Sequence, residues 1–139
     1  MQKIPNNLLA AIVMICLLTG CATPVGKLAD DDIVWTSTNV ATNYQQAYRN
    51  IKRSLDVCYE FAVESNLYTD IGEGEFNLYL KNVFGGNHGF VYGLIKLKKV
   101  GEETNVRIGI QTIYAKPIFA KSKTAETLIN AANGSTTCN

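Results

Sequence analysis

The feature that most constrains the fold of this chain is the placement of its four cysteines. Cys16 and Cys21 lie in or just after an apolar N-terminal segment, whereas Cys58 and Cys138 lie far apart in the rest of the chain. Two cysteines left over in an oxidising compartment tend to pair, and this pair would close most of the chain into one loop. The compartment therefore has to be considered first.

The first 20 residues are typical of an export signal. Lys3 precedes an apolar run of 11 residues, 8–18, which is too short to cross a ~30 Å hydrocarbon core as a helix but suits a secretory signal. The run then closes with Leu18-Thr19-Gly20-Cys21. These four residues resemble the lipobox of bacterial lipoproteins, which implies cleavage before Cys21 and lipidation of its sulfur. The alternative is an ordinary signal peptide in which Cys21 has no role.

The lipobox resemblance implies a domain organisation and an address. We expect a signal peptide at 1–20, a tether at 21–32 and a single domain at 33–139. Ala22 follows Cys21 where an aspartate would resemble an inner-membrane retention signal. We therefore expect a lipid anchor in the outer membrane, facing the periplasm, or in the inner or cell membrane if the cell has no outer membrane. The run Asp30-Asp31-Asp32 is expected to be solvated linker; a calcium site is the alternative, but calcium loops space their carboxylates around a glycine turn.

Cleavage and lipidation would leave only Cys58 and Cys138, and we predict that they form a disulfide. Closing a loop of about 80 residues would stabilise the fold by about 4.5 kcal/mol in the loop-entropy model. Cys138 lies in a polar tail, after Gly134, that has nothing else to hold it. Two free thiols are the alternative.

The charges balance overall but not along the chain. Without Lys3 there are 12 basic and 12 acidic side chains, which argues against nucleic acid as a partner because that requires a basic surplus. Residues 21–80 hold four basic and nine acidic side chains, and residues 81–139 hold eight basic and three acidic ones. If the two halves occupy separate surfaces, a charged partner is indicated; the alternative is that they face each other within the fold.

Hydrophobic periodicity predicts a helix over about 43–64. Its apolar stripe falls at helical spacing, and Thr42 or Asn43 can cap its start. Cys58 would lie on the core side, one turn before the helix ends. The stripe comprises Ala47, Tyr48, Ile51, Leu55, Cys58 and Ala62.

Period-two alternation predicts about four strands, with a possible further strand at 33–38. A hairpin is expected over 66–80 around Gly72-Glu73-Gly74, and a glycine-rich loop at 85–89 follows it. Two more strands, at 90–100 and 106–114, are expected on either side of a turn at Gly101.

A short helix with the stripe Ala125, Leu128, Ile129 and Ala132 should follow, capped by Ser122 or Thr124 and ended before Gly134. This order predicts a two-layer α+β domain, an antiparallel β-meander with two helices packed on one face and a partly wet opposite face.

These pieces resemble small bacterial lipoproteins that share a lipobox, an early helix with a cysteine near its end, a β-meander and a C-terminal cysteine. The corresponding parts are 18–21, Cys58, 76–114 and 134–138. Lipoproteins of the outer-membrane β-barrel assembly machinery are similar in element order. The resemblance concerns the fold and carries no function.

Catalytic residues are not recognisable, so we expect no enzyme, no cofactor and no metal. His88 is the only histidine, which excludes a multi-histidine metal site, and we expect it to face solvent in its loop. The glycine-rich segments do not lie between a strand and a helix as phosphate loops do. Glu73 and Glu75 could act as paired carboxylates but are expected to be solvated in a turn.

Two functions remain. The first is an accessory envelope protein that binds another envelope protein through the open sheet face or a sheet edge. The second is a small-ligand or peptidoglycan-binding module. No ligand-binding residue is identified for it, although Tyr68, Tyr79, Tyr92 and Tyr114 are candidate contacts. We expect the first, because tyrosines at strand spacing are usually half-buried sheet residues.

Overall fold

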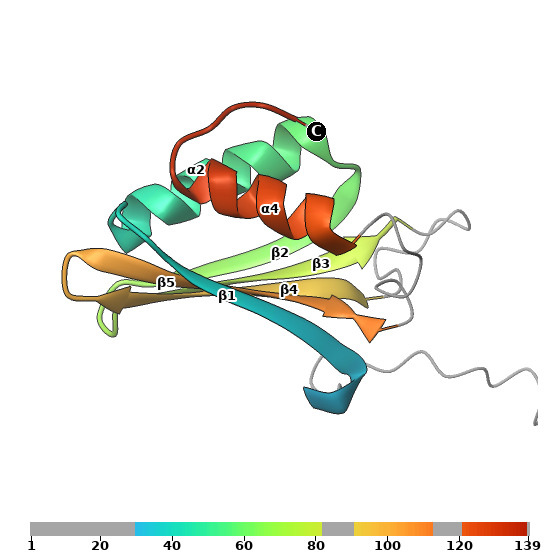
Figure 1. Ribbon diagram of the computed structural model, residues 1–139, viewed down its shortest axis with the longest axis horizontal. Helices are drawn as coiled ribbons and strands as arrows, with labels where there is room; N and C mark the ends of the chain where they lie inside the picture. Colours follow the sequence, from blue (N-terminus) through green and yellow to red (C-terminus); the bar gives the residue numbers. More distant parts are fainter. Residues whose placement is uncertain (1–29, 82–90, 113–120, 139) are drawn as a thin grey trace, which may run out of the picture.

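The computed structural model describes residues 30–81, 91–112 and 121–138 as one α+β domain, with two helices on one face of an antiparallel sheet (Figure 1). The sheet has five strands, one more than the sequence analysis predicted. The elements in chain order are η2 (Asp30–Asp32), β1 (Ile33–Val40), α2 (Tyr44–Cys58), β2 (Phe61–Tyr68), β3 (Glu73–Leu80), β4 (Val91–Val100), β5 (Glu103–Gln111) and α4 (Lys121–Ala132).

The sheet is a meander with one strand added at its edge. Its order is β1-β5-β4-β3-β2, so strands β2 to β5 are neighbours in sequence and β1 pairs with the last of them. Ile33 lies opposite Gln111 and Val40 opposite Thr104. The possible strand at 33–38 is therefore real and two residues longer. Helix α2 carries the chain from β1 to β2, at opposite edges of the sheet, across the face that both helices cover (Figure 1).

Helix α2 begins as predicted but ends six residues early. The Asn43 side chain accepts a hydrogen bond from the Gln46 backbone N–H at 3.0 Å, which caps the first turn. The predicted end at 64 is wrong, because the helix stops at Cys58 and residues 61–68 pair along their whole length with β3. Ala62 matched the helical stripe by spacing, but tertiary strand pairing outweighs local helical periodicity here.

The turns also lie slightly away from their predicted positions. The β2–β3 turn spans residues 69–72, so Glu73 and Gly74 belong to β3 rather than to the turn. Gly72 has φ +68° and Gly101 has φ +62°, a backbone conformation that only glycine adopts at low cost. Gly101 and Glu102 alone join β4 to β5. Tyr114 and the loop at 85–89 lie outside the described residues.

The hydrophobic core fills the space between the sheet and the helices. Ala47, Ile51 and Leu55 of the predicted α2 stripe are at most 1 % exposed. Tyr48, from the same helix, stacks on Phe76 with ring centroids 4.6 Å apart. Burying each large side chain contributes about 1.5–3 kcal/mol, so this layer supplies most of the driving force for folding. The largest fully buried hydrophobic side chains are Phe76, Ile51, Leu55, Leu78, Ile95, Leu97, Ile108, Leu128 and Val106.

Helix α4 packs on α2 and ends in a glycine cap, as predicted. Gly134 has φ +100°; its N–H donates to the Ala131 carbonyl at 2.8 Å, and the Ser135 N–H donates to the Asn130 carbonyl at 3.0 Å. These two bonds form a Schellman motif. The predicted caps at the start are wrong, because α4 begins at Lys121 and both Ser122 and Thr124 lie inside it.

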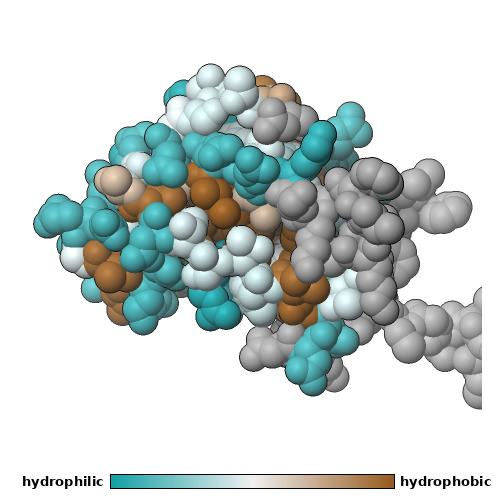
Figure 2. All heavy atoms as spheres, viewed as in Figure 1, coloured by the Kyte–Doolittle hydropathy of each residue, from teal (hydrophilic) through white to brown (hydrophobic). Residues whose placement is uncertain are grey.

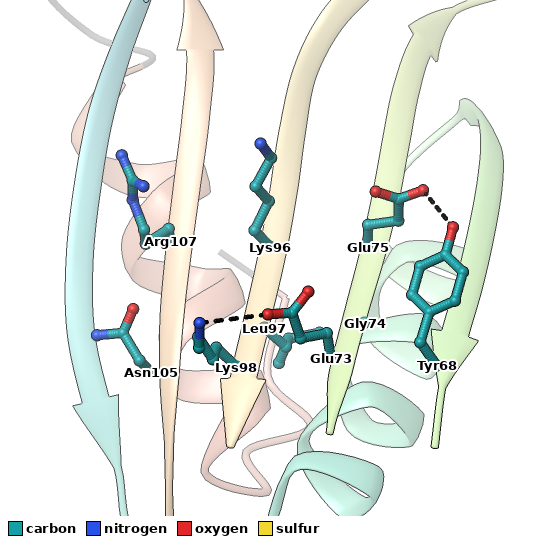
Figure 3. Close-up of a pocket in the computed structure, with 9 residues that line it drawn as sticks. All are labelled: Tyr68, Glu73, Gly74, Glu75, Lys96, Leu97, Lys98, Asn105 and Arg107. Atoms are coloured by element: carbon teal, nitrogen blue, oxygen red, sulfur yellow. Dashed lines mark hydrogen bonds and ion pairs between the residues drawn. The ribbon is translucent and has the colours of Figure 1, made fainter. Parts of the chain in front are cut away.

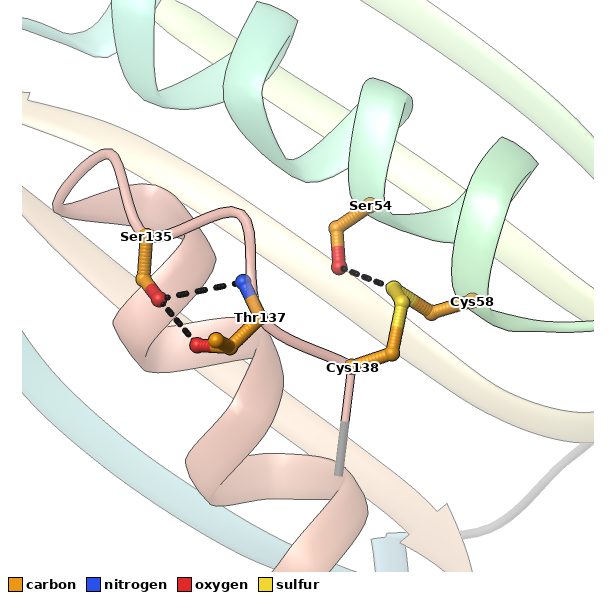
Figure 4. Close-up of a disulfide and its surroundings, with 5 residues drawn as sticks. All are labelled: Ser54, Cys58, Ser135, Thr137 and Cys138. Carbon is orange, nitrogen blue, oxygen red and sulfur yellow. Dashed lines mark hydrogen bonds between the residues drawn. A yellow bond between two sulfur atoms is a disulfide. The ribbon is translucent and has the colours of Figure 1, made fainter.

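A disulfide joins Cys58 to Cys138, as the cysteine count predicted, with 5.3 Å between the Cα atoms. After Gly134 the tail turns back along the helices and reaches the end of α2 (Figure 4). Cys58 is the last residue of α2, not one turn before its end. The Asn50 side chain adds a second tie between the helices by donating to the Ala132 carbonyl at 3.3 Å.

We expect Cys138→Ser to lower the free energy of unfolding by about 2–5 kcal/mol, because the tail would no longer tie α4 to α2. Urea unfolding of full-length protein in detergent, followed by circular dichroism, measures this change. The exposed neighbour Thr136 provides the control, since Thr136→Ala should stay within about 0.5 kcal/mol of wild type. Equal unfolding midpoints for wild type and Cys138→Ser would show that the bridge does not stabilise the domain.

Candidate functional site

The candidate site is the face of the sheet that the helices leave uncovered, which we call the open face. Alternation along each strand sends one set of side chains to the helices and the other set to this face. In sheet order from β2 to β1 the open face carries Ala62, Glu64, Asn66 and Tyr68; Glu73, Glu75, Asn77 and Tyr79; Leu94, Lys96, Lys98 and Val100; Glu103, Asn105, Arg107, Gly109 and Gln111; and Ile33, Trp35, Ser37 and Asn39.

Charge is divided across the open face. Glu73 and Glu75 project from β3, and the cations Lys96, Lys98 and Arg107 project from β4 and β5 (Figure 3). Glu64 on β2 adds to the acidic half, and Glu103, at the start of β5, is a carboxylate within the basic half. The acidic first half and the basic second half of the chain thus become adjacent halves of one surface. Among the described residues, one ion pair on this face joins the acidic half to the basic half: Glu73 and Lys98 are 3.4 Å apart.

A shallow groove of about 210 Å³ crosses this boundary (Figure 3). This volume is below the ~300–1,000 Å³ of pockets that enclose small-molecule ligands. The groove is therefore better suited to a side chain of a partner than to a whole organic ligand. Its lining residues are Tyr68, Glu73, Gly74, Glu75, Lys96, Leu97, Lys98, Asn105 and Arg107.

The carboxylates of the open face are held by their neighbours. Glu75 accepts a hydrogen bond from the Tyr68 hydroxyl at 2.9 Å and another from the Asn66 amide at 3.4 Å. Glu64 accepts one from the Tyr79 hydroxyl at 2.8 Å. The bond to Glu75 is the main cause that raises the pKa of Tyr68 above its ordinary value. The acidic half is therefore an internally bonded surface.

Trp35 lies across the basic half because Gly109 leaves room for it. A Cβ at Gly109 would stand 2.5 Å from Ile33 Cγ2 and 2.8 Å from Trp35 Cζ3, so a larger residue cannot occupy this position without displacing the ring. The Arg107 guanidinium lies 4.7 Å from the indole centroid and the Lys96 ammonium 5.7 Å. Both distances are within the range of cation–π attraction.

The tyrosines proposed as ligand contacts do not form one platform. Tyr68 and Tyr79 lie on the open face of neighbouring strands, and Tyr79 is only 8 % exposed. Tyr92 faces the helices, where its ring stacks on Phe61 with centroids 4.6 Å apart. Tyr114, His88 and Cys21 lie outside the described residues.

The predicted turn carboxylates are strand residues. Glu73 and Glu75 lie on β3 with their side chains on the open face. Asp30–Asp32 form a short 3₁₀ turn that leads directly into β1. Within residues 30–81, 91–112 and 121–138, no group of three or more His, Cys, Asp or Glu side chains could hold a metal ion.

The cluster of Trp35, Lys96 and Arg107 was not predicted. The sequence places these residues on three different predicted strands, and β1–β5 pairing over a separation of more than 70 residues joins two of them. One signal was present, because Gly109 interrupts an otherwise strictly alternating strand. A glycine at such a position marks a close approach by another group.

Comparison of the chain with models of known protein families, with curated proteins and with solved structures finds no match to any of them. The described helices, α2 and α4 included, are too short or too polar to cross a membrane.

We expect Gly109→Ala to push the Trp35 ring off the sheet and to lower the free energy of unfolding by about 1–3 kcal/mol through overpacking. Trp35 is the only tryptophan, so its fluorescence emission reports the displacement directly. The exposed Ser37, on β1 of the same face, provides the control variant Ser37→Ala. Unchanged emission and stability in Gly109→Ala would contradict the packing of Trp35 on this glycine.

Burial and then the hydrogen bond to Glu64 raise the pKa of Tyr79 to about 12. The folded state therefore favours the neutral phenol. The neutral Tyr79 phenol contributes its full share of stability below about pH 10, the ordinary tyrosine pKa. This contribution is lost as the pH rises through about 12, where the folded protein loses the phenol proton.

We expect Glu64→Gln to lower the pKa of Tyr79, because the variant removes the negative charge beside the phenol. Tyrosinate absorbance during an alkaline titration measures this, with Tyr79→Phe to assign the signal and the exposed Glu60→Gln as control. The assignment is wrong if Tyr79→Phe leaves the high-pH end of the titration unchanged.

Proposed function

We propose that this chain is a lipid-anchored lipoprotein of the bacterial envelope that acts without catalysis and binds another envelope protein through the open face. The observation that carries the proposal is the unequal covering of the sheet. Both helices pack on one face, and the other presents a broad polar and aromatic surface with a shallow groove. A sheet face that the described helices leave uncovered, with side chains of both charges, is suited to a protein partner of complementary charge.

The surface chemistry supports a polar docking mode. On the side of the molecule shown in Figure 2, hydrophobic residues reach the surface only in separated patches among hydrophilic ones. The large hydrophobic side chains most exposed in the described chain are Val57, Tyr68, Ile71 and Val100. They come from α2, β2, the β2–β3 turn and β4. An interface on the open face, which carries charged side chains of both signs, would be sensitive to salt.

The lipobox resemblance supports the anchor. Cys21 precedes the first described residue, Asp30, by only nine positions, and a chain of that length spans at most about 30 Å. The domain would be held close to the membrane surface, with a partner in the same membrane or at its face. Ala22 supports the outer membrane as the location.

The alternative is a peptidoglycan- or small-ligand-binding module. It is supported by Tyr68, which lines the groove and is 40 % exposed. The groove is small, and Tyr68 is the one aromatic residue that lines it among the described residues; both observations favour the protein partner.

Chemical crosslinking in intact cells, followed by purification of this protein, tests the function. A stoichiometric envelope protein in the crosslinked product is the expected result. Absence of any partner, together with co-sedimentation with cell wall, would favour the peptidoglycan module instead.

We expect Cys21→Ser to abolish lipidation and release the protein from washed membranes, because anchoring depends on acyl chains that each contribute about 0.8 kcal/mol per buried CH₂. Labelled palmitate and fractionation measure the two effects, and a density gradient assigns the membrane. The signal-peptide variant Cys16→Ser is the control and should remain lipidated. Palmitate incorporation into Cys21→Ser would contradict the lipobox.

A further inference from the structure

Among the residues that the structure describes, two cations on the open face have no acidic partner. Lys96 and Arg107 lie directly opposite each other on β4 and β5, an arrangement in which like charges repel. Lys96 also lies opposite Glu75 on β3, but Figure 3 shows the Lys96 ammonium turned away from this carboxylate. Within the described residues, neither Lys96 nor Arg107 makes a hydrogen bond or an ion pair. Both cations instead make cation–π contacts with the Trp35 ring.

The other charged groups of this face are already engaged. Lys98 pairs with Glu73, Glu75 is bonded to Tyr68 and Asn66, and Glu64 is bonded to Tyr79. Glu103 accepts a hydrogen bond from the Asn39 amide at 3.3 Å. Glu64, Glu75 and Glu103 keep their negative charge, because their hydrogen-bond donors are neutral. Lys96 and Arg107 are nevertheless the cations of this face whose N–H donors remain free among the described residues.

Trp35 holds the two cations in place. A guanidinium stacked on an aromatic ring keeps its N–H groups free at the edge to donate to a carboxylate. The ring is seated against Gly109 and Ile33, and its own Nε1–H is buried without an acceptor in the structure. Because an orphaned donor costs about 1–3 kcal/mol, hydrogen bonding does not explain the position of the ring.

We propose that Lys96 and Arg107, held on Trp35, bind a carboxylate presented by an acidic segment of the protein partner. The proposal rests on the proposed function, whose docking surface it narrows to one half of the open face. A carboxylate between the two cations would replace their repulsion by two charge-assisted contacts. Nucleic acid is disfavoured, because binding to a phosphate backbone requires a basic surplus, whereas Glu73 and Glu75 line the same groove as Lys96, Lys98 and Arg107.

The emission of Trp35, the only tryptophan in the chain, reports binding at this position. Full-length protein in non-ionic detergent is titrated with a short synthetic peptide of alternating glutamate and threonine. We expect a saturable change in emission that weakens with added salt. Lys96→Gln and Arg107→Gln should each raise the apparent Kd about threefold to tenfold.

Three comparisons make the result decisive. Lys52→Gln, an exposed cation on α2, should bind like wild type, and a glutamine–threonine peptide should not bind. Equal affinities for wild type, Lys96→Gln and Arg107→Gln would overturn the proposal. Binding of a peptidoglycan stem peptide, which also carries free carboxylates, without binding of the glutamate peptide would overturn the assignment to a protein segment.

Crosslinking of the double variant Lys96→Gln/Arg107→Gln in cells separates this proposal from the proposed function. A partner captured by wild type and lost in the double variant, which should retain the wild-type circular dichroism spectrum, supports both. A partner captured equally by both proteins refutes the carboxylate site and leaves the proposed function standing. If wild type captures no partner, the proposed function fails. The peptide titration then decides by itself whether Lys96 and Arg107 bind a carboxylate.

Discussion

Burial of one sheet face beneath α2 and α4 is the interaction on which the rest of this structure depends. Because strand side chains alternate between faces, placing Phe76, Ile95 and Ile108 against the helices fixes which residues face outward. A slip of one residue in any strand would exchange these sets and expose the core. The polar open face and its division of charge are thus consequences of how the opposite face is packed.

A disulfide holds the two helices together at the end of α2. Cys58 ends α2, the Schellman turn at Gly134 reverses the chain after α4, and the disulfide joins the returning tail to α2. The bond closes a long segment of chain, and its stabilisation is attributed chiefly to the restriction of the unfolded state. The fastening is well matched to an exported protein, because such a bond persists only where thiols are not continually reduced.

The open face combines two kinds of surface. On β2 and β3 the carboxylates Glu64 and Glu75 accept hydrogen bonds from tyrosine and amide groups of the same face. On β4 and β5 two like charges share one aromatic ring. The attraction of a cation to an exposed ring, about 0.5–1 kcal/mol, is comparable to the repulsion between like charges across a strand pair, so this half remains receptive to an anion.

The sequence by itself determined the elements with strong local signals. The α2 stripe around Ile51, the alternation around Ile108, the glycine cap at Gly134 and the pairing of Cys58 with Cys138 could all be predicted, because periodicity, backbone conformation and thiol chemistry act within a few residues or by simple count.

Only the tertiary structure decided the rest. Phe61 to Tyr68 became a strand because β3 was available to pair with it, although Ala62 continued the helical spacing. The Trp35 cluster likewise required β1 to reach the far edge of the meander and lie beside Gly109. Such contacts join residues far apart in the chain, and their energies depend on neighbours that a local pattern does not contain.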